Sequence, residues 1–366
     1  MSMPASPFDG PQPRRETVSG VFSAEEVALA NRNSGAMLEL LALDVTPLGA
    51  HYLLTHFDVP VIDPDTHRLR FEGAFDAPFQ IGLDEIRALP QVTMPVTLEC
   101  AGNGRAGMDP RPFSMPWMYE AVGTAEWTGT PLAPLIERAR PRAGVVDFAF
   151  EGADHGYDKG VGHAFGRSLT PAELAGLDVL LVHQMNGQPL APQHGAPLRI
   201  VVPGWYGMAS VKWLTSITAL TERYQGFQQV GTYRFRQTPD EPGAPVTTIR
   251  VKSLMVPPGV PDWITRKRLL APGPVTLRGR AWAGSVPVAR VEVLLDGCWQ
   301  EATLGEPLGR HAWTGWQIDW DAAPGHHVLA CRATDADGNT QPLQPEWNLS
   351  GFANNAVQCV EVFVER

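Results

Sequence analysis

Several kinds of segment and motif are missing from this sequence. No apolar run approaches the roughly 20 residues that a membrane-spanning helix needs, and the formal net charge of −10 disfavours general binding to nucleic acid or anionic membranes. Neither a GxSxG nor an HExxH motif occurs, so the sequence supports neither a serine hydrolase nor a zinc protease. The four cysteines form no CxxC pair and no CxxCH motif, and we therefore expect no haem attached to this chain.

The composition that remains is typical of a folded protein with two domains. A chain of 366 residues is long for one small domain. Its content of 44% hydrophobic and 19% charged residues is typical of a protein that buries a hydrophobic core. The 36 glycines and 34 prolines indicate many loops and argue against a helical bundle. We expect a leader over residues 1–22, a first domain over 23–235 and a second domain over 236–366.

The first residues are rich in proline and in polar side chains. They include Arg14 and Arg15, a pair that also occurs in twin-arginine export signals. The segment that follows, residues 16–20, is too polar to be the apolar core of a signal. We interpret residues 1–22 as a flexible leader and expect a cytoplasmic protein, or a periplasmic one if a leader has been removed.

The first domain mixes short helices with strands and has no regular βαβ period, which predicts an α+β fold. Caps, prolines and β-branched runs give the boundaries of these elements. The expected helices cover 23–31 with Ser23 as cap, 83–89, 130–139 with Thr130 as cap, and a turn after the Thr170 capping box; the expected strands cover 69–73, 96–100, 145–150, 179–182 and 198–202, with a hairpin turn at 186–187.

The second domain contains only strand signals. Residues 237–262 are rich in proline and predict a linker or an extended crossing segment. From residue 275 onward, short strands alternate with Gly and Asp turns, which is typical of an immunoglobulin-like β-sandwich. The expected strands cover 275–282, 288–295, 316–320, 327–333 and 357–364.

Two motifs have simpler explanations than a ligand site. Residues 160–166 are similar to a dinucleotide fingerprint with one residue too many, and we interpret them as a flexible loop. Residues 335–346 imitate a calcium loop but have Thr340 where glycine is needed. We therefore interpret Asp337–Gly338 as a hairpin turn.

Three of the cysteines lie in strand-like sequence near the C-terminus. We interpret Cys298, Cys331 and Cys359 as small buried apolar residues. A disulfide between Cys298 and Cys331 is the alternative, and it is disfavoured in a reducing compartment.

Cys100 stands apart from the other cysteines. It follows the apolar run 96–98, and Gly102 and Gly104 come soon after it. Because glycine has no Cβ, we expect the backbone to approach a large ligand here and the thiol to lie at an open edge. A soft thiolate in such a place can be a nucleophile, a redox thiol or a metal ligand. The residues alone leave these three roles open.

A series of segments, in order along the chain, resembles the sulfite oxidase family of molybdenum enzymes. The resemblance extends over roughly residues 30–365, and several long motifs in order are more specific than any one of them. The segments are LECAGNGR at 98–105, MNGQPL at 185–190, HGAPLR at 194–199, VVPG at 201–204, VKW at 211–213, YQGF at 224–227 and WNLSG at 347–351.

The resemblance implies a molybdopterin cofactor bound to the first domain. In that family the cysteine that matches Cys100 is a molybdenum ligand, and a thiolate is a suitable soft donor. Arginine and lysine bind phosphate through charge-assisted hydrogen bonds, and aspartate and histidine can pair with pterin nitrogens. The implied cofactor contacts come from Thr55, His56, Asp154, His194, Arg199, Ser210 and Lys212.

The resemblance also implies three residues that act on the substrate. Tyr224 matches an active-site tyrosine near the metal, Arg105 matches an arginine that binds the substrate anion, and Trp117 matches an active-site tryptophan. We therefore expect these three side chains to lie around the thiol of Cys100.

Two further arginines implied by the resemblance are replaced, by Leu54 and by Thr314. Each missing guanidinium removes a charge-assisted hydrogen bond to the substrate, worth about 1.5–3 kcal/mol. Lys159, Arg167 and His311 are the candidates to supply the missing charge. These departures leave the substrate open while the cofactor prediction stands.

The function implied by the resemblance is oxidation of sulfite to sulfate by oxygen-atom transfer. Electrons pass singly to a separate acceptor, a cytochrome or a quinone-linked partner, and the second domain forms a homodimer. One alternative is a related molybdenum oxotransferase that acts on another S-oxide, N-oxide or oxyanion. The other is a catalytically silent binding protein that uses the sandwich for adhesion.

Overall fold

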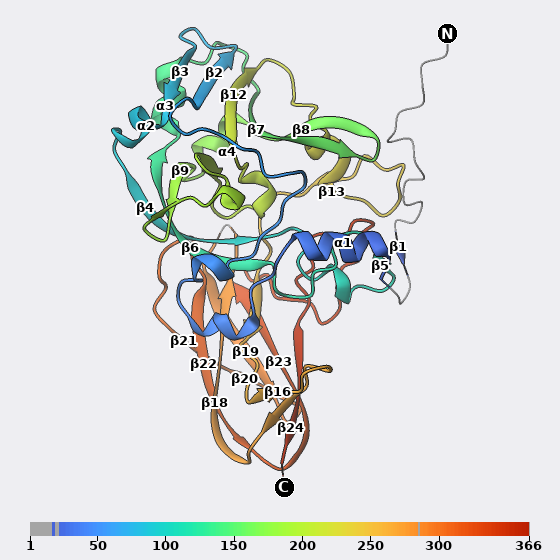
Figure 1. Ribbon diagram of the computed structural model, residues 1–366. Coiled ribbons are helices and arrows are strands. Elements are labelled where there is room, and N and C mark those ends of the chain that lie inside the picture. Colours follow the sequence, from blue (N-terminus) through green and yellow to red (C-terminus); the bar gives the residue numbers. More distant parts are fainter. Residues whose placement is uncertain (1–16, 19–21, 285, 366) are drawn as a thin grey trace.

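The computed structural model describes residues 17–18, 22–284 and 286–365 and shows two bodies stacked end to end (Figure 1). The first body contains helices and strands, and the second consists of strands, with the C-terminus at its far end. The predicted order, an α+β domain followed by a β-sandwich, is confirmed. The leader expected over 1–22 lies almost wholly outside the described residues.

One five-stranded sheet of the first domain leads directly to Cys100. Its edge strand β4 (Val92–Glu99) pairs antiparallel with β6 (Val122–Pro131), and the pairing runs to Glu99 opposite Val122. The side chains at this end of both strands are buried, which fixes where β4 ends. The remaining strands of the sheet are β9 (Leu180–Met185), β10 (Gln188–Pro189) and β11 (Arg199–Val201).

The other five-stranded sheet has the order β3-β2-β12-β7-β8. β12 (Leu214–Leu220) is parallel to β2 (Arg68–Gly73), while β3 (Phe79–Gly82), β7 (Asp147–Asp158) and β8 (Val161–Leu169) pair antiparallel. The flexible loop expected over 160–166 is therefore wrong. Gly160 lies in the turn before β8, whereas Gly162 and Gly166 lie within the strand, where the side chains of Tyr157 and Tyr224 occupy the space beside them.

The helices are short and begin at local caps. Ser23 caps α1 (Ala24–Arg32), accepting from the backbone N–H of residue 26 at 3.2 Å, and Thr170 caps α4 (Pro171–Ala175) through the predicted capping box. α2 (Leu83–Arg87) also agrees with its prediction. The cap predicted at Thr130 is wrong, because Thr130 belongs to β6 and α3 (Ala133–Ala139) begins later.

Short turns and small pairings complete the first domain. β1 (Thr17–Val18) pairs with β5 (Arg111–Pro112), and β13 (Arg234–Phe235) pairs with β14 (Ala244–Pro245). The single-turn helices are η1 (Leu38–Ala42), η2 (Leu48–Ala50), η3 (Arg105–Gly107), η4 (Pro192–His194), η5 (Gly207–Ala209) and η6 (Gln228–Thr232).

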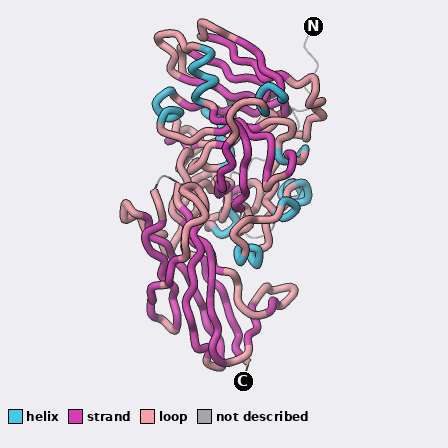
Figure 2. Tube along the Cα trace, turned by 90° about the vertical axis from the view of Figure 1, so that its left-hand side faces the viewer, coloured by secondary structure: helices cyan, strands magenta, loops and turns pink. Residues whose placement is uncertain are grey.

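The second domain packs a four-stranded sheet on a six-stranded sheet, and its strands run along the long axis of the molecule (Figure 2). Their inward side chains form a separate core. The first sheet contains β15 (Lys252–Met255), β18 (Gly273–Trp282), β22 (Thr314–Ala322) and β21 (Thr303–Leu304); the second contains β16 (Val260–Pro261), β17 (Arg268–Leu270), β24 (Gln358–Val364), β23 (Gly325–Asp335), β19 (Val288–Leu295) and β20 (Cys298–Glu301).

The segment expected as a linker contains a strand of the sandwich. All four residues of β15 are buried, and β15 pairs with the end of β18, Lys252 opposite Trp282. The sequence concealed this strand because it begins with a lysine and a serine, whose side chains find polar partners inside the protein.

Of the remaining predictions for the second domain, one is confirmed and another is wrong in part. The hairpin turn at Asp337–Gly338 is confirmed, and the Asp335 carboxylate accepts from backbone N–H groups of its own loop. Cys331 is buried, but Cys298 and Cys359 are exposed, so the interpretation of these two as core residues is wrong. All four cysteines are free thiols. Among the described residues, no helix is long and apolar enough to span a membrane.

Candidate active site

A cavity of about 680 Å³, including its open mouth, lies at the end of β4 in the first domain. Every residue predicted to contact the cofactor, except Thr55, lines it. The lining consists of His51, Tyr52, Leu53, Leu54, His56, Leu98, Cys100, Ala101, Asp154, Phe165, His194, Arg199, Gly207, Met208, Ser210, Lys212, Trp213 and Tyr233.

The thiol of Cys100 lies inside this cavity. Its backbone N–H donates to the carbonyl of Ala121 at 2.9 Å, and the residue is only 7% exposed, so it does not lie at the open edge that the sequence predicts. Burial raises the pKa of the Cys100 thiol, while Arg105 and the side chain of Trp117 act in the opposite direction. The thiol therefore keeps its proton at neutral pH in this structure.

The glycines after Cys100 make room for protein and not for a ligand. A Cβ at Gly102 would lie 2.6 Å from the guanidinium of Arg105, and a Cβ at Gly104 would lie 3.0 Å from the side chain of Asn354. Gly104 also has a φ of 93°, which glycine adopts without strain. The expectation that both glycines face a large ligand is wrong, because other parts of this chain occupy the space.

Two cations at the cavity, the buried Arg199 and the half-buried Lys212, form no salt bridge within the described part of the chain. Arg199 donates to the carbonyls of His194 and Ser210, both at 3.0 Å, and its Nε has no hydrogen-bond partner. Lys212 donates to the carbonyl of Leu54 at 3.0 Å. Burial lowers the pKa of Arg199 to about 10 and that of Lys212 to about 7. Since neither cation forms a salt bridge within the described residues, an anion bound here would stabilise both.

The histidines of the cavity are neutral at pH 7, whereas Asp154 is mostly a carboxylate. Burial lowers the pKa of His51 to about 4 and the pKa values of His56 and His194 to about 3, so all three rings are neutral at pH 7. Burial raises the pKa of Asp154 to about 6, against the opposing effect of Lys212. His51 Nε2 and Asp154 Oδ1 are buried and have no hydrogen-bond partner, which indicates a ligand that supplies one.

The tyrosine of the cavity is Tyr233. Its phenol oxygen lies 2.8 Å from His56 Nε2, and burial raises its pKa far above the usual range, so it remains a neutral phenol. Tyr224, the predicted tyrosine, does not line the cavity and packs beside Gly166 of β8. Neither Tyr233 nor His51 lies in one of the recognised motifs, so the sequence did not predict either residue in the cavity.

Three other predicted residues do not line the cavity surface. Arg105 is 5% exposed and donates to the carbonyls of Ser350 and Met115 at 2.7 and 2.9 Å. Trp117 is buried, and its indole N–H makes no regular hydrogen bond. Thr55 is buried and donates its backbone N–H to an asparagine side chain at 2.7 Å. Arg105 therefore affects the thiol through its charge, while its hydrogen bonds hold the backbone.

The candidates for the missing substrate arginines differ in position. Arg167 is 2% exposed, donates to a backbone carbonyl at 2.7 Å and has its guanidinium carbon 5.6 Å from the ring centre of Tyr233. His311 bonds an aspartate at 2.8 Å and faces a different groove, as does Thr314. Lys159 lies in the exposed turn between β7 and β8. Arg167 is thus the cation of this group that approaches the cavity.

These observations fit a large cofactor with anionic and hydrogen-bonding groups. Unpartnered buried atoms of Arg199, His51 and Asp154 surround a cavity that also holds one thiol. No group of three or more His, Cys, Asp or Glu side chains suited to a metal occurs among the described residues. A metal bound here would therefore take Cys100 as its protein ligand and receive its other ligands from a cofactor.

Comparison with known protein families agrees with this arrangement. Residues 56–228 match the oxidoreductase molybdopterin-binding domain, and residues 244–365 match the Mo-co oxidoreductase dimerisation domain. The fold and the cavity thus define a molybdopterin-binding oxidoreductase.

Similar proteins narrow the family. Sulfite oxidase of Gallus gallus is 33% identical over 384 residues, 96% of this chain and 79% of that protein. Mitochondrial sulfite oxidase of Homo sapiens is 34% identical over 348 residues, 87% of this chain, and nitrate reductase [NAD(P)H] of Hordeum vulgare is 31% identical over 88% of this chain and 39% of that protein. The chain belongs to the sulfite oxidase family of molybdopterin oxidoreductases.

The length and fold comparisons add two facts. The chain spans about 62% of the length of the mammalian mitochondrial sulfite oxidases that it matches. A chain of the sulfane dehydrogenase SoxCD from Paracoccus pantotrophus has the same fold, with a TM-score of 0.77, 23% identity, and coverage of 95% of this chain and 93% of that chain.

Proposed function

We propose that this protein is a molybdopterin-dependent oxidoreductase that oxidises a small oxyanion, with sulfite as the first candidate. The observation that carries the proposal is the cavity itself, which places the Cys100 thiol together with two cations, Arg199 and Lys212, that form no salt bridge with any other described residue. The family and its sulfite oxidase members support the same class of reaction.

The cofactor residues act by charge and by hydrogen bonding. Arg199 and Lys212 bind the phosphate, because both are cations that line the cavity and form no salt bridge with the rest of the described chain. Asp154 and His194 pair with pterin nitrogens, and Cys100 ligates the metal. When bound, the cofactor supplies a two-electron redox centre for oxygen-atom transfer.

Tyr233 and His56 orient the substrate beside the thiol. We propose that His56 carries its proton on Nε2 and donates it to the phenol oxygen, which leaves the Tyr233 O–H free to donate to a substrate oxygen. Behind the cavity wall, Arg105 and Arg167 add positive charge near Tyr233. This charge favours an anion over a neutral substrate.

The choice of sulfite rests on relatives and stays open to one alternative. Nitrate reductases also match over a similar share of this chain, at 31% identity compared with 34% for sulfite oxidase, so another S-oxide, N-oxide or oxyanion is the second candidate. Leu54 lines the cavity where the resemblance implies an arginine, which favours weaker binding of a dianion.

We propose that electrons leave for a separate acceptor, a cytochrome or a quinone-linked partner, and that residues 244–365 join two copies, as the match to the dimerisation domain supports. The cytoplasmic location stays a prediction, because residues 1–16 are outside the described part of the chain.

Sulfite-dependent reduction of ferricyanide by protein loaded with molybdenum tests the proposed function. Turnover in the wild type and its loss in Cys100→Ser are expected, because serine is a poor donor for a soft, sulfur-ligated metal. Cys359→Ser is the matched control, since that cysteine is exposed in the second domain. A fully loaded protein that turns over nitrate and not sulfite would support the alternative substrate. A protein that takes up no molybdenum in a host able to make the cofactor would overturn the enzyme assignment.

A further inference from the structure

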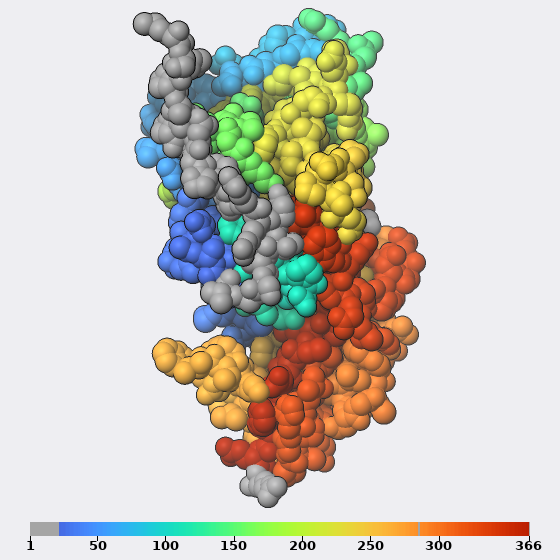
Figure 3. All heavy atoms as spheres, turned by 90° about the vertical axis from the view of Figure 1, so that its right-hand side faces the viewer, coloured from blue at the N-terminus to red at the C-terminus, as the bar shows by residue number. Residues whose placement is uncertain are grey.

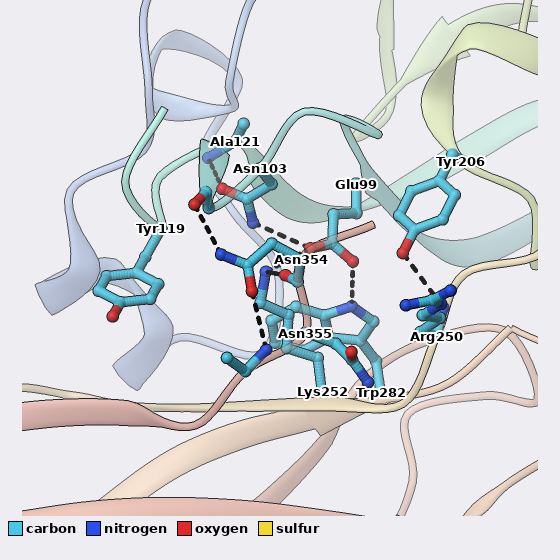
Figure 4. Close-up of polar contacts among 12 residues, drawn as sticks. Glu99, Asn103, Tyr119, Ala121, Tyr206, Arg250, Lys252, Trp282, Asn354 and Asn355 are labelled. Carbon is cyan, nitrogen blue, oxygen red and sulfur yellow. Dashed lines mark hydrogen bonds and ion pairs between the residues drawn. The ribbon is translucent and has the colours of Figure 1, made fainter. Parts of the chain in front are cut away.

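A buried ion pair joins the two domains at the residue before Cys100. Glu99 ends β4 and Lys252 begins β15, both are 1% exposed, and Lys252 Nζ lies 2.9 Å from Glu99 Oε1. The other carboxylate oxygen accepts from the indole N–H of Trp282 at 2.8 Å (Figure 4). The second domain therefore holds both oxygens of the carboxylate that precedes the thiol.

Asn103 connects this carboxylate to the backbone around the thiol. Its side-chain N–H donates to Glu99 Oε1 at 3.0 Å, and its side-chain oxygen accepts from the N–H of Ala121 at 3.1 Å (Figure 4). Its backbone N–H donates to the carbonyl of Cys100 at 2.9 Å. A shift of the Glu99 carboxylate would thus be transmitted to the backbone on both sides of Cys100.

The C-terminal segment 350–354 holds the rest of the cysteine turn, which we define as residues 99–105. The N–H of Ala353 donates to the carbonyl of Ala101 at 2.7 Å, and the side chain of Asn354 donates to the carbonyl of Gly104 at 2.7 Å. In Figure 3 red surface residues near the C-terminus lie beside the blue-green segment that follows the turn, where the indole N–H of Trp347 donates to the carbonyl of Pro110 at 2.8 Å.

Lys252 also links these two sets of contacts. Its ammonium donates both to Glu99 and to the carbonyl of Asn354, the latter at 2.8 Å. One buried cation therefore fixes the start of the cysteine turn relative to the segment that fixes its end. Gly104 is required for this fit, because a Cβ there would crowd the Asn354 side chain.

The chemistry of the Glu99–Lys252 ion pair suits a role in orienting the cysteine turn better than a role in holding the two domains together. Burying an ammonium and a carboxylate carries a desolvation penalty, and apolar side chains of similar volume hold domains together as well or better. Charge-assisted hydrogen bonds instead define direction, and here three donors reach the two oxygens of Glu99. Glu99 directly precedes Cys100 in the chain, so the direction of its hydrogen bonds bears on the orientation of a metal ligand.

We infer that Lys252 is a positioning residue for Cys100: it holds the cysteine turn from the second domain so that the thiol faces the cavity. The importance of that direction rests on the proposed function, in which Cys100 is the metal ligand. The second domain thus completes the site of the first domain, in addition to any role in joining copies.

Hydrogen exchange of the full chain, isolated with and without its cofactor, tests the inference in Lys252→Met. Peptides that contain the cysteine turn should exchange at least tenfold faster than in the wild type, while peptides from β19 and β23 keep their rates. Arg268→Met is the matched control, because Arg268 is a buried cation of the same domain that binds the carbonyls of residues 257–259. In the loaded variant, the thiolate-to-metal absorption band should shift or weaken.

The inference is overturned if Lys252→Met leaves exchange of the turn within twofold of the wild type, or if Arg268→Met accelerates it equally. Should Lys252→Met not fold, the double variant with Glu99→Gln removes the unpaired buried charge. Faster exchange of the turn in that variant is expected, whereas a wild-type rate shows that Lys252 only neutralises Glu99 and overturns the inference. Exchange in cofactor-free protein involves no reaction, so failure of the proposed function would leave this result unchanged.

Discussion

The four cations near the cavity differ in whether they line it. Arg199 and Lys212 line the cavity, while Arg105 and Arg167 do not. All four donate to backbone carbonyls, and Arg199 and Arg167 each keep a buried Nε without a hydrogen-bond partner among the described residues. The first pair is therefore available to an anion that enters the cavity, whereas the second pair acts on the cavity only through its charge.

This difference explains how one cavity can treat its cofactor and its substrate differently. Direct contact with two cations gives strong binding of a phosphate. A substrate beside Cys100 meets instead the neutral pair Tyr233 and His56, with cations at a distance. We therefore expect tight retention of the cofactor and moderate affinity for the substrate.

The largest effect should follow from removing both cations that line the cavity, Arg199 and Lys212. Arg199→Met with Lys212→Met loses two charge-assisted contacts of about 1.5–3 kcal/mol each, so affinity for the cofactor should fall by about 10²- to 10⁴-fold. Molybdenum and pterin per purified chain measure the loss, with Arg268→Met as control. Full retention of the cofactor by the double variant would show that the phosphate binds elsewhere.

Substitution of the two candidate tyrosines, Tyr233 and Tyr224, should have clearly different effects on kcat. Tyr233→Phe removes one hydrogen bond to a charged substrate, worth about 1.5–3 kcal/mol, and should lower kcat about ten- to a hundredfold. Tyr224→Phe should change kcat less than about twofold, since its hydroxyl does not line the cavity. Steady-state kinetics with sulfite checks both, and the opposite order would restore Tyr224 as the catalytic tyrosine.

Arg105→Met distinguishes a backbone contact from a substrate contact. Because its guanidinium binds the carbonyls of Met115 and Ser350, we expect a fall of about 2–4 kcal/mol in the free energy of unfolding. Denaturant unfolding measures this change. An unchanged stability with a KM for sulfite at least tenfold higher would instead show that Arg105 holds the substrate directly.

The smallest effect concerns pH. Burial lowers the pKa of Lys212 from 10.5 to about 7 in the cofactor-free protein, so the unfolded chain binds the extra proton between these values and stability rises with pH across that window. Below about pH 7 the buried ammonium is charged, and sulfate should stabilise it.

We therefore expect sulfate to raise the melting temperature by about 2–5 °C at pH 6 and by less at pH 8.5. Thermal unfolding at constant ionic strength, with chloride as control, measures the difference. Lys212→Met should abolish its pH dependence, and an equal sulfate effect at both pH values in the wild type would contradict the assignment.

The sequence predicted what local chemistry determines. The strand before Cys100, the caps at Ser23 and Thr170 and the hairpin at Asp337–Gly338 follow from neighbouring residues, and the structure has each of them. The order of the motifs also predicted that Arg199 and Lys212 lie in the cavity, because both residues belong to recognisable segments that are close to one another in the sequence.

The sequence could not predict what depends on distant partners. Tyr233 lies in no recognised motif and enters the cavity only through the packing of the single-turn helix η6 and the segment after it. β15 was concealed because Lys252 is polar, and its burial makes sense only beside Glu99, 153 residues away. The space beside Gly104 belongs to Asn354, 250 residues further on. Such pairings have no local signal.

These long separations have a consequence for how the enzyme is made. Arg105 meets Ser350 across 245 residues, so the cysteine turn takes its final shape only after the C-terminal strands have been synthesised. A chain leaving the ribosome contains both proposed phosphate-binding cations by residue 212, long before it contains the support for its thiol. We therefore expect metal insertion to follow translation, and a chain truncated before residue 350 to offer the cofactor the proposed phosphate site without an oriented sulfur.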